Sequence, residues 1–292
     1  MNNITNSPID KITFKNHNFL IKRDDLLHED FNGNKARKFY YFLKNDFPNI
    51  TTLISYGSNQ SNAMYSLSVL AKLKNWDFKY YTNHLPSFLI DTPSGNYKYA
   101  LENGMDIKVG EYDISTLEVE DTDLLVSEGG AICEAKYGIE ILANEIKEYK
   151  KLNNIKNLKV FLPSGTGTTS LFLQQYLEDE VLTVPCVGNS EYLALQFSDL
   201  IKDKSQHPTI LEPSRKYHFG KLYKENYEIH KELKKKTNIE FDLLYDSIGW
   251  NTLLNYYEEY KDDIIIYIHQ GGVKGNKTML ERYIRKYDKK KV

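Results

Sequence analysis

The sequence of 292 residues has few of the features that mark specialised protein classes. Its two cysteines, Cys133 and Cys186, lie far apart without CxxC spacing and support neither a disulfide framework nor a zinc site. Basic and acidic residues number 38 and 40, so no positive excess indicates a nucleic-acid binder. No apolar run approaches the roughly 20 residues that span a bilayer, and the first residues do not resemble a secretory signal. We expect a cytoplasmic enzyme or small-molecule binder that binds no metal, nucleic acid or membrane.

What is present is a regular alternation of short β-branched or aromatic runs with amphipathic stretches. The chain has no internal repeat and no Pro/Gly-rich linker, and its 41% hydrophobic content can fill two cores. Strands alternating with helices predict βαβ units and a largely parallel sheet, so the fold class is α/β. The predicted strands cover 51–56, 77–82, 107–110, 123–128, 158–163 and 182–188, and the stretch 263–272 is a strand that runs into a glycine turn. The predicted helices cover 61–76, 95–103, 134–150 and 276–287, and 165–177 is a turn into a further helix.

Four polar, glycine-containing turns fall where predicted strands reach their carboxyl ends. They cover 57–62, 129–131, 165–169 and 271–272. In an open α/β sheet, ligands bind at this edge. The four turns therefore predict one common site.

The segment FNGNKARKFYYFL (31–43) places two lysines at the start of a predicted helix. Gly33 suits a turn, Asn34 is a plausible N-cap, and Lys35 and Lys38 follow one turn apart on one face. One interpretation is a solvated basic helix start. The other is a lysine held for chemistry, whose amine becomes a Schiff-base nucleophile because burial and a neighbouring cation lower its pKa.

Two strand-to-helix turns offer donors to an anion. YGSNQSN (56–62) is either an ordinary Ser/Asn-rich cap or a set of amide and backbone donors. PSGTGTT (163–169) has glycines and threonine hydroxyls, but neither the lysine of a P-loop nor the GxGxxG spacing of a dinucleotide fold. A nucleophilic lysine together with a cradle for a single phosphate points to pyridoxal phosphate (PLP).

The motifs also resemble those of one family, in the family's order, over residues 20–275. The matching segments are IKRDDLLHEDFNGNKARKF, YGSNQSNA, SEGGAICEAKYGIEILANEI, PSGTGTTSLFL, KYHFG, LLYDS and HQGGVKG. On these segments the chain resembles the 1-aminocyclopropane-1-carboxylate (ACC) deaminase / D-cysteine desulfhydrase family of tryptophan-synthase-β-like, type II PLP-dependent enzymes. Ser58, Ser127, Thr168 and Gln270 depart from the family pattern, and Ser58, Thr168 and Gln270 could change specificity or abolish turnover.

The resemblance implies an α/β fold of two domains, with parallel-rich twisted sheets, helices on both faces and the cofactor in the cleft between the domains. Residues 1–49 and 146–292 would form the large cofactor-binding domain, and residues 50–145 a smaller inserted domain. A homodimer is usual for the family.

The resemblance also implies roles for individual residues. Lys35 would carry the cofactor, and Lys38 would help to neutralise its phosphate. Asp246 would lie near the pyridine nitrogen, and Tyr245 and Ser61 are the candidates for proton transfer. The other cofactor contacts would come from Asn62, Gly165, Thr166, Gly167, Thr168 and Thr169. Substrate contacts would come from Gln60, Ser61, Asn62, Tyr245 and either Tyr217 or Phe219, of which only Tyr217 has a hydroxyl.

The resemblance implies a deaminating enzyme that releases ammonia and a 2-oxo acid from a small amino acid. Asp246 is acidic as in ACC deaminases, whereas Gln270 is polar as in D-cysteine desulfhydrases, so the substrate stays open between the two. Two alternatives remain. One is a PLP-binding protein with little or no turnover, and the other is a sugar-phosphate or nucleotide binder that uses only the glycine loops.

Overall fold

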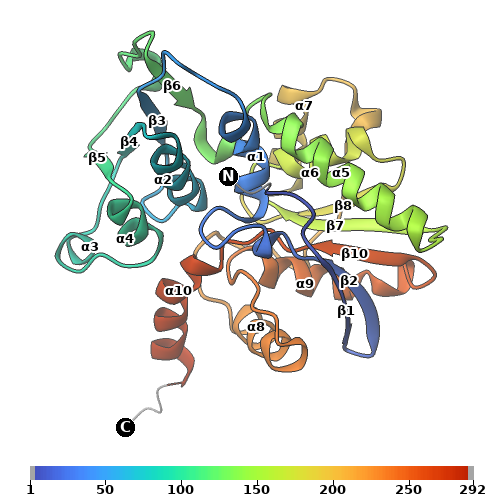
Figure 1. The fold of residues 1–292 in the computed structure, drawn as a ribbon. Coiled ribbons are helices and arrows are strands. Elements are labelled where there is room, and N and C mark those ends of the chain that lie inside the picture. The colour runs from blue at the N-terminus through green and yellow to red at the C-terminus, as the bar shows by residue number, and fades with distance from the viewer. Residues whose placement is uncertain (1–3, 289–292) are drawn as a thin grey trace.

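The computed structural model describes residues 4–288, which form two sheets joined side by side (Figure 1). All neighbouring strands are parallel except the hairpin of β1 with β2. The six-stranded sheet has the order β1 (Ile9–Phe14), β2 (His17–Lys22), β10 (Ile264–Ile268), β7 (Leu158–Ser164), β8 (Glu180–Pro185) and β9 (Thr209–Ile210). The four-stranded sheet has the order β5 (Met105–Val109), β4 (Asp77–Thr82), β3 (Thr52–Tyr56) and β6 (Asp123–Val126).

Helices cover both faces of the six-stranded sheet, because alternate strand residues point to opposite sides. In β10, Ile265 and Tyr267 enter one core while Ile266 and Ile268 enter the other. The first core is covered by α8 (Lys224–Thr237) and α9 (Asp246–Asn255), and the second by α5 (Ala135–Leu152), α6 (Thr168–Tyr176) and α7 (Ser190–Leu200). Strands buried on both faces read as continuous apolar runs, as IIIYI of β10 does.

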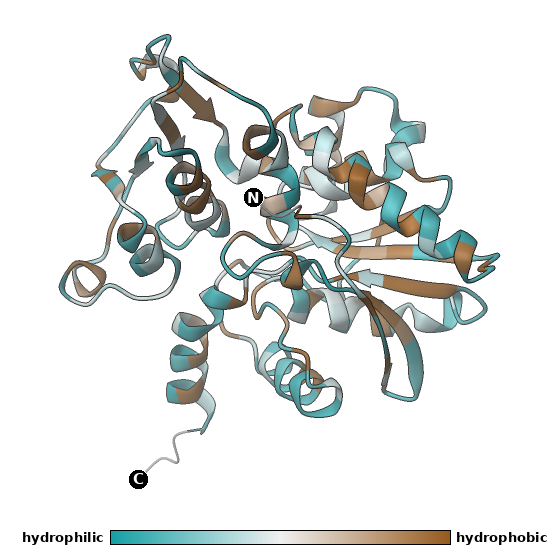
Figure 2. Cartoon of the chain, in the orientation of Figure 1, coloured by the Kyte–Doolittle hydropathy of each residue, from teal (hydrophilic) through white to brown (hydrophobic). Residues whose placement is uncertain are grey.

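The four-stranded sheet has its own core. Its apolar residues pack against α1 (Gly33–Lys44), α2 (Asn62–Lys74), α3 (Ser87–Asp91) and α4 (Gly95–Glu102). Figure 2 shows hydrophobic residues concentrated on β3, β6 and α2, whereas α8 and α10 (Asn276–Tyr283) are largely hydrophilic. No helix within residues 4–288 combines the length and the apolar character that crossing a membrane requires.

The chain forms the six-stranded sheet from both of its ends and the four-stranded sheet from its middle. The predicted division at residues 49 and 145 separates the strands in this way, and as a domain boundary it stays a prediction. The helices at the two predicted boundaries do not follow this division. The apolar face of α1 lies in the core of the four-stranded sheet, and that of α5 lies in a core of the six-stranded sheet. Helix α1 thus lies between the two sheets, where its lysines can reach a site formed by both.

Candidate active site

One cavity of about 680 Å³ lies at the carboxyl ends of strands from both sheets. Residues of all four predicted turns line it: Ser58–Asn62 after β3, Gly129 after β6, Gly165–Thr169 after β7, and Gly271 after β10. The sequence prediction that these turns meet is confirmed. Such a cavity is of the size at which proteins bind small molecules and cofactors.

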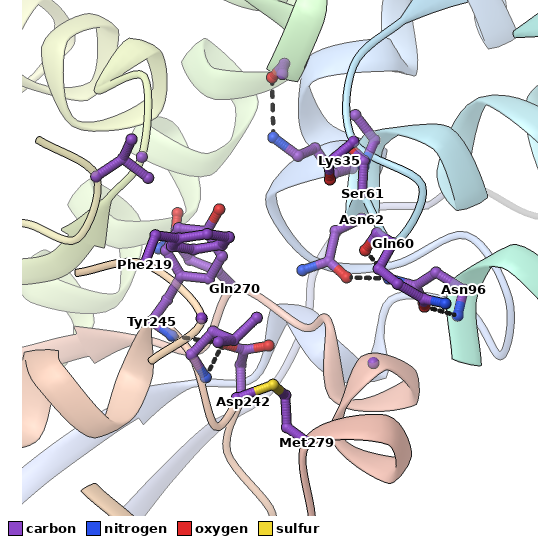
Figure 3. A pocket seen from close by; sticks show the side chains of 18 of the residues that line it. Lys35, Gln60, Ser61, Asn62, Asn96, Phe219, Asp242, Tyr245, Gln270 and Met279 are labelled. Atoms are coloured by element: carbon purple, nitrogen blue, oxygen red, sulfur yellow. Dashed lines mark hydrogen bonds between the residues drawn. The ribbon is translucent and has the colours of Figure 1, made fainter. Parts of the chain in front are cut away.

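Helix α1 begins in direct contact with the turn after β10. Gly33 has a φ of +65°, and a Cβ atom there would lie 1.9 Å from the backbone oxygen of Gln270, so only glycine fits. The backbone N–H of Asn34 donates to the same oxygen at 3.1 Å. This close contact places the first turn of α1 at the cavity wall, with Lys35 at its border (Figure 3).

Lys35 and Lys38 share one acceptor. Their Nζ atoms donate to the backbone oxygen of Gly129 at 2.8 Å and 3.0 Å, and Lys38 also reaches Oγ1 of Thr166 at 3.4 Å. Burial lowers the pKa of Lys35 to about 8, although the carboxylate of Glu128 acts in the opposite direction. Burial and the neighbouring Lys35 ammonium lower the pKa of Lys38. Within residues 4–288 neither lysine forms a salt bridge, so the pair can serve as a nucleophile beside a cation for an anionic ligand.

The turn between β7 and α6 adds further donors. Gly167, with a φ of +72°, caps the helix, and Thr168 and Thr169 of its first turn line the cavity, so the N-terminal end of α6 borders it. The hydroxyls of Thr166 and Thr168 lie 3.0 Å apart. Oγ1 of Thr169 is buried and has no hydrogen-bond partner in the described part of the chain. A buried hydroxyl without a partner costs free energy unless a ligand or water binds it, so this turn fits a bound phosphate.

The turn after β3 brings three predicted residues to the cavity. Ser61 caps α2, and its Oγ accepts the N–H groups of Ala63 and Met64 at 3.1 Å and 3.4 Å, which leaves the hydroxyl proton for another acceptor. Asn62 turns its amide nitrogen towards the cavity (Figure 3). Both ends of the Gln60 side-chain amide are hydrogen-bonded within the protein: Nε2 donates to the backbone oxygen of Ser94, and Oε1 accepts from the backbone N–H of Asn96. A substrate contact from Gln60 would therefore have to come from its backbone.

Tyr245 and Asp246 lie at the start of α9. Asp246 is buried, and its carboxylate accepts from the Tyr267 hydroxyl at 2.7 Å and from the backbone N–H of Asp242 at 2.9 Å. Burial raises the pKa of Asp246 well above its ordinary value and raises the pKa of the Tyr245 hydroxyl. Tyr245 therefore stays protonated at neutral pH and is suited to donate a proton.

Asp242 is a site residue that the sequence analysis missed. It lines the cavity, its Oδ1 accepts the N–H groups of Leu244 and Tyr245 at 2.9 Å and 2.6 Å, and burial raises its pKa to about 7. An aspartate whose side chain accepts the N–H groups two and three residues later is a typical start of a turn or helix. The aspartate that begins the segment DLLYD was the signal in the sequence that could have identified this residue.

The sequence left a substrate contact open between Tyr217 and Phe219, and the structure places Tyr217 away from the cavity. Its ring packs against Tyr223 at 4.9 Å in a core of the six-stranded sheet, and it does not line the cavity. Phe219 lines the cavity instead, with its ring centroid 5.3 Å from that of Tyr245 (Figure 3). The segment that carries both residues has no helix or strand periodicity, so the sequence does not show which side chain faces inwards.

The departures from the family motifs have structural explanations at two positions. Nε2 of Gln270 donates to the backbone oxygen of Pro163 at 2.6 Å, and its Oε1 accepts from Asn34 at 3.1 Å. Gln270 therefore joins the end of β7 to the start of α1. Thr168 is fully buried in the first turn of α6, whereas Ser58 is exposed at the cavity, and nothing in the structure explains that serine.

Comparison with known proteins places this cavity in a known fold. No protein-family model and no curated protein matches the sequence. Among solved structures, an ACC deaminase homologue has a TM-score of 0.77 at 20% identity, covering 94% of this chain and 93% of its own. A hydrogen sulfide-producing enzyme from Fusobacterium nucleatum (TM-score 0.63, 16% identity, 93% and 97% covered) and an L-serine ammonia-lyase from Rhizomucor miehei (0.64, 11%, 96% and 98%) are also similar. The chain thus has the type II fold of PLP-dependent enzymes, which confirms the expected fold class.

Proposed function

We propose that this chain is a PLP-dependent enzyme that removes the amino group of a small amino acid and releases ammonia and a 2-oxo acid. The observation that carries the proposal is the placement of Lys35. Its amine has a lowered pKa, borders the cavity, and lies one helical turn from Lys38, which faces the donors of the turn after β7. A solvated basic helix start would leave both amines in water instead.

The lining residues fit the cofactor group by group. Lys35 offers the amine for its aldehyde. A bound phosphate would favour the protonated form of Lys38, and this ammonium and the unpartnered hydroxyl of Thr169 would then be the cation and the donor that hold the phosphate. Asn62 would offer its amide N–H₂ to the ring oxygen, and the carboxyl groups of Asp242 and Asp246, which also line the cavity, would supply an acid for the basic ring nitrogen. When bound, PLP supplies an electron-withdrawing ring that stabilises negative charge at the substrate α-carbon.

The protein's own groups would bind the substrate and move its protons. The Ser61 hydroxyl and the positive end of the α2 dipole suit the substrate carboxylate, because Ser61 and Asn62 at the start of α2 line the cavity. The Lys35 amine, neutral above a pH of about 8, suits removal of the α-proton. The protonated hydroxyl of Tyr245 suits donation of a proton to the departing group. The ring of Phe219 packs beside that of Tyr245, with the centroids 5.3 Å apart.

Within this class we propose ACC or D-cysteine as the substrate, on the basis of the sequence motifs and of two structural neighbours, an ACC deaminase homologue and a hydrogen sulfide-producing enzyme. The choice between them rests on the products. ACC has no α-hydrogen, so its ring must be opened before ammonia and 2-oxobutyrate form. D-Cysteine has an α-hydrogen, and its elimination releases sulfide, pyruvate and ammonia.

We further propose that the protein is a homodimer located in the cytoplasm.

The test is an absorbance spectrum of the purified protein, followed by separate addition of D-cysteine, ACC and L-serine. We expect a visible band that disappears with borohydride, and one amino acid that yields ammonia with a 2-oxo acid. Sulfide with pyruvate would identify a desulfhydrase, and 2-oxobutyrate an ACC deaminase. A band without any product would support the alternative of a PLP-binding protein with little turnover. A protein that stays colourless after addition of PLP would refute the proposal.

The pKa of Lys35 predicts how cofactor capture depends on pH. Only the neutral amine attacks an aldehyde, and with a pKa of about 8 its neutral fraction rises only about twofold from pH 8 to pH 10. An ordinary lysine with a pKa of 10.5 would gain about 75-fold over the same interval. We therefore expect the rate at which cofactor-free protein develops colour with PLP to level off above pH 8. A rate that keeps rising through pH 10 would contradict the assignment of this lysine.

Tyr245→Phe tests the proposed proton donor. We expect kcat to fall by about 10²-fold, since general acid catalysis contributes at least that much, while the absorbance of bound PLP stays unchanged. Tyr217→Phe is the matched control, because it removes a tyrosine hydroxyl on the same side of the molecule but outside the cavity. Its kcat should remain within twofold of the unmodified protein. Equal losses in the two variants would argue against a role for Tyr245 in proton transfer.

A further inference from the structure

Asn96, the second residue of α4, joins the start of this helix to the cavity-lining turn after β3. Its side chain is 1% exposed and borders the cavity. Nδ2 of Asn96 donates to the backbone oxygen of Gln60 at 3.0 Å and to Oδ1 of Asn62 at 2.7 Å. Nothing in the sequence motifs indicates a role for Asn96, since it lies 34 residues from Asn62 and outside the strand-to-helix turns.

The backbone determines which way each amide faces. The oxygen of Gln60 can only accept, so the end of Asn96 that faces it must be the N–H₂ group. The same N–H₂ group faces Asn62, which must therefore present its oxygen to Asn96. The amide nitrogen of Asn62 is then left on the cavity side, as Figure 3 shows. The hydrogen bond to the Gln60 backbone thus fixes the orientation of the Asn96 amide, and the second hydrogen bond, between the two side chains, selects one of the two orientations of Asn62.

Gln60 holds Asn96 in place by the same logic. The backbone N–H of Asn96 donates to Oε1 of Gln60 at 3.0 Å, and Nε2 of Gln60 donates to the backbone oxygen of Ser94 at 3.0 Å. Gly95 lies between these two contacts with a φ of +59°, and a Cβ atom there would approach Oε1 of Gln60 to 2.6 Å. The start of α4 is therefore docked on the turn after β3 with little freedom to shift.

One atom of the Asn96 amide destabilises the folded protein, which indicates that the other end of the amide has a role. Its own Oδ1 is buried and has no hydrogen-bond partner within residues 4–288. A buried carbonyl oxygen without a partner is destabilising, so an apolar side chain of similar size would suit the packing better. The benefit of asparagine here is the N–H₂ group that it directs at Gln60 and Asn62.

We propose that Asn96 is a positioning residue that sets the orientation of Asn62, so that the Asn62 amide nitrogen faces the bound cofactor. The inference rests on the proposed function, because it assumes that PLP occupies the cavity. Asn96 itself makes no contact with reacting atoms in this role. Without its N–H₂ group, Asn62 can turn its oxygen to the cavity and present an acceptor where a donor is needed.

Asn96→Asp tests the proposal, because the side chain keeps its shape and loses its N–H₂ group. Cofactor-free protein is titrated with PLP, and both the dissociation constant and the position of the absorbance band are measured. We expect binding to weaken about tenfold and the band to shift. Asn103→Asp is the matched control: it lies at the end of the same helix and its Nδ2 donates to Ser68 at 3.1 Å, away from the cavity. It should bind PLP as the unmodified protein does.

A double-mutant cycle with Asn62→Ala separates positioning from general damage. If Asn96 acts through Asn62, Asn96→Asp changes PLP affinity by less than twofold in the Asn62→Ala background. An equal loss in both backgrounds, or no loss in either, would overturn the proposal. Asn96→Ala provides the same comparison if the aspartate variant does not fold. If the unmodified protein itself binds no PLP, the proposed function fails and this inference fails with it, whereas PLP binding that is insensitive to Asn96 refutes the inference alone.

Discussion

Lys35→Ala is expected to abolish covalent cofactor binding and to lower turnover by at least about 10³-fold. The amine of Lys35 is both the group that would bind the aldehyde and the proposed base for the substrate α-proton, because it borders the cavity and burial lowers its pKa to about 8. Alanine removes both roles without a change in charge elsewhere. The measurements are the visible absorbance band, turnover, and the mass of the peptide that carries the label after borohydride reduction.

Lys38→Ala is the control for this prediction, since it makes the same change one turn along the same helix. Lys38 would bind the phosphate and not the aldehyde, so the label should remain on Lys35 while PLP binds about 10- to 100-fold more weakly. The outcome that contradicts the assignment is a label that stays at full yield in Lys35→Ala, or one that is lost from Lys38→Ala and kept in Lys35→Ala. Either result would exchange the roles of the two lysines.

Local sequence pattern predicted most of the elements that position the site. The helices expected over 61–76 and 134–150 are α2 (Asn62–Lys74) and α5 (Ala135–Leu152). The hairpin of β1 with β2 was missed. Its turn has a positive φ at both Lys15 and Asn16, which the sequence does not signal, because lysine is unusual in this conformation and the pair lacks glycine. The parallel pairing of β2 with β10 joins residues about 245 positions apart, and no local pattern encodes it.

The residues of the candidate site likewise fall into those that a local pattern predicts and those that depend on tertiary structure. Lys35, Lys38 and the turn after β7 were predictable, because each belongs to a short segment whose residue types suggest its chemistry. Asn96 was missed because its contact with Asn62 depends on how α4 docks on another turn. The sequence left Tyr217 and Phe219 open, because the direction of each side chain depends on the tertiary path of an irregular segment. A short segment of sequence thus indicates which chemistry its residues can perform, but it does not show in which direction their side chains point.

The arginine between the two lysines has a role that neither local pattern nor chemistry alone reveals. Arg37 is 1% exposed and forms paired hydrogen bonds with Asp24, at 3.0 Å and 2.8 Å, and with Glu145, at 2.8 Å and 2.7 Å. Lys22 contacts Glu145 at 2.6 Å from β2. This buried network joins α1 to the six-stranded sheet through β2 and to α5. It therefore determines where Lys35 and Lys38 lie.

Arg37→Leu is expected to lower the free energy of unfolding by about 3–5 kcal/mol, because removing one partner of a buried ionic network leaves the others uncompensated. Among residues 4–288, the fully buried Asp24 would keep only the Ser7 hydroxyl as a side-chain partner. Denaturant unfolding of the cofactor-free protein measures the change. Arg215→Leu is the matched control, because its pair with Glu225 is exposed and spans 3.5 Å, and such pairs contribute about 0–1 kcal/mol.

The loss of unfolding free energy in Arg37→Leu should also depend on pH. Burial acts to raise the pKa of Glu145, but Arg37 and Lys22 hold it below its ordinary value of 4.5. A carboxylate with a lowered pKa stabilises the folded protein above the unfolded-state pKa, and this contribution disappears as the pH falls through the folded-state pKa. The difference between Arg37→Leu and the unmodified protein should therefore be full at pH 7 and shrink below about pH 4.5. A difference that stays constant down to pH 3 would mean that lost packing of the arginine side chain, and not its charge, stabilises this junction.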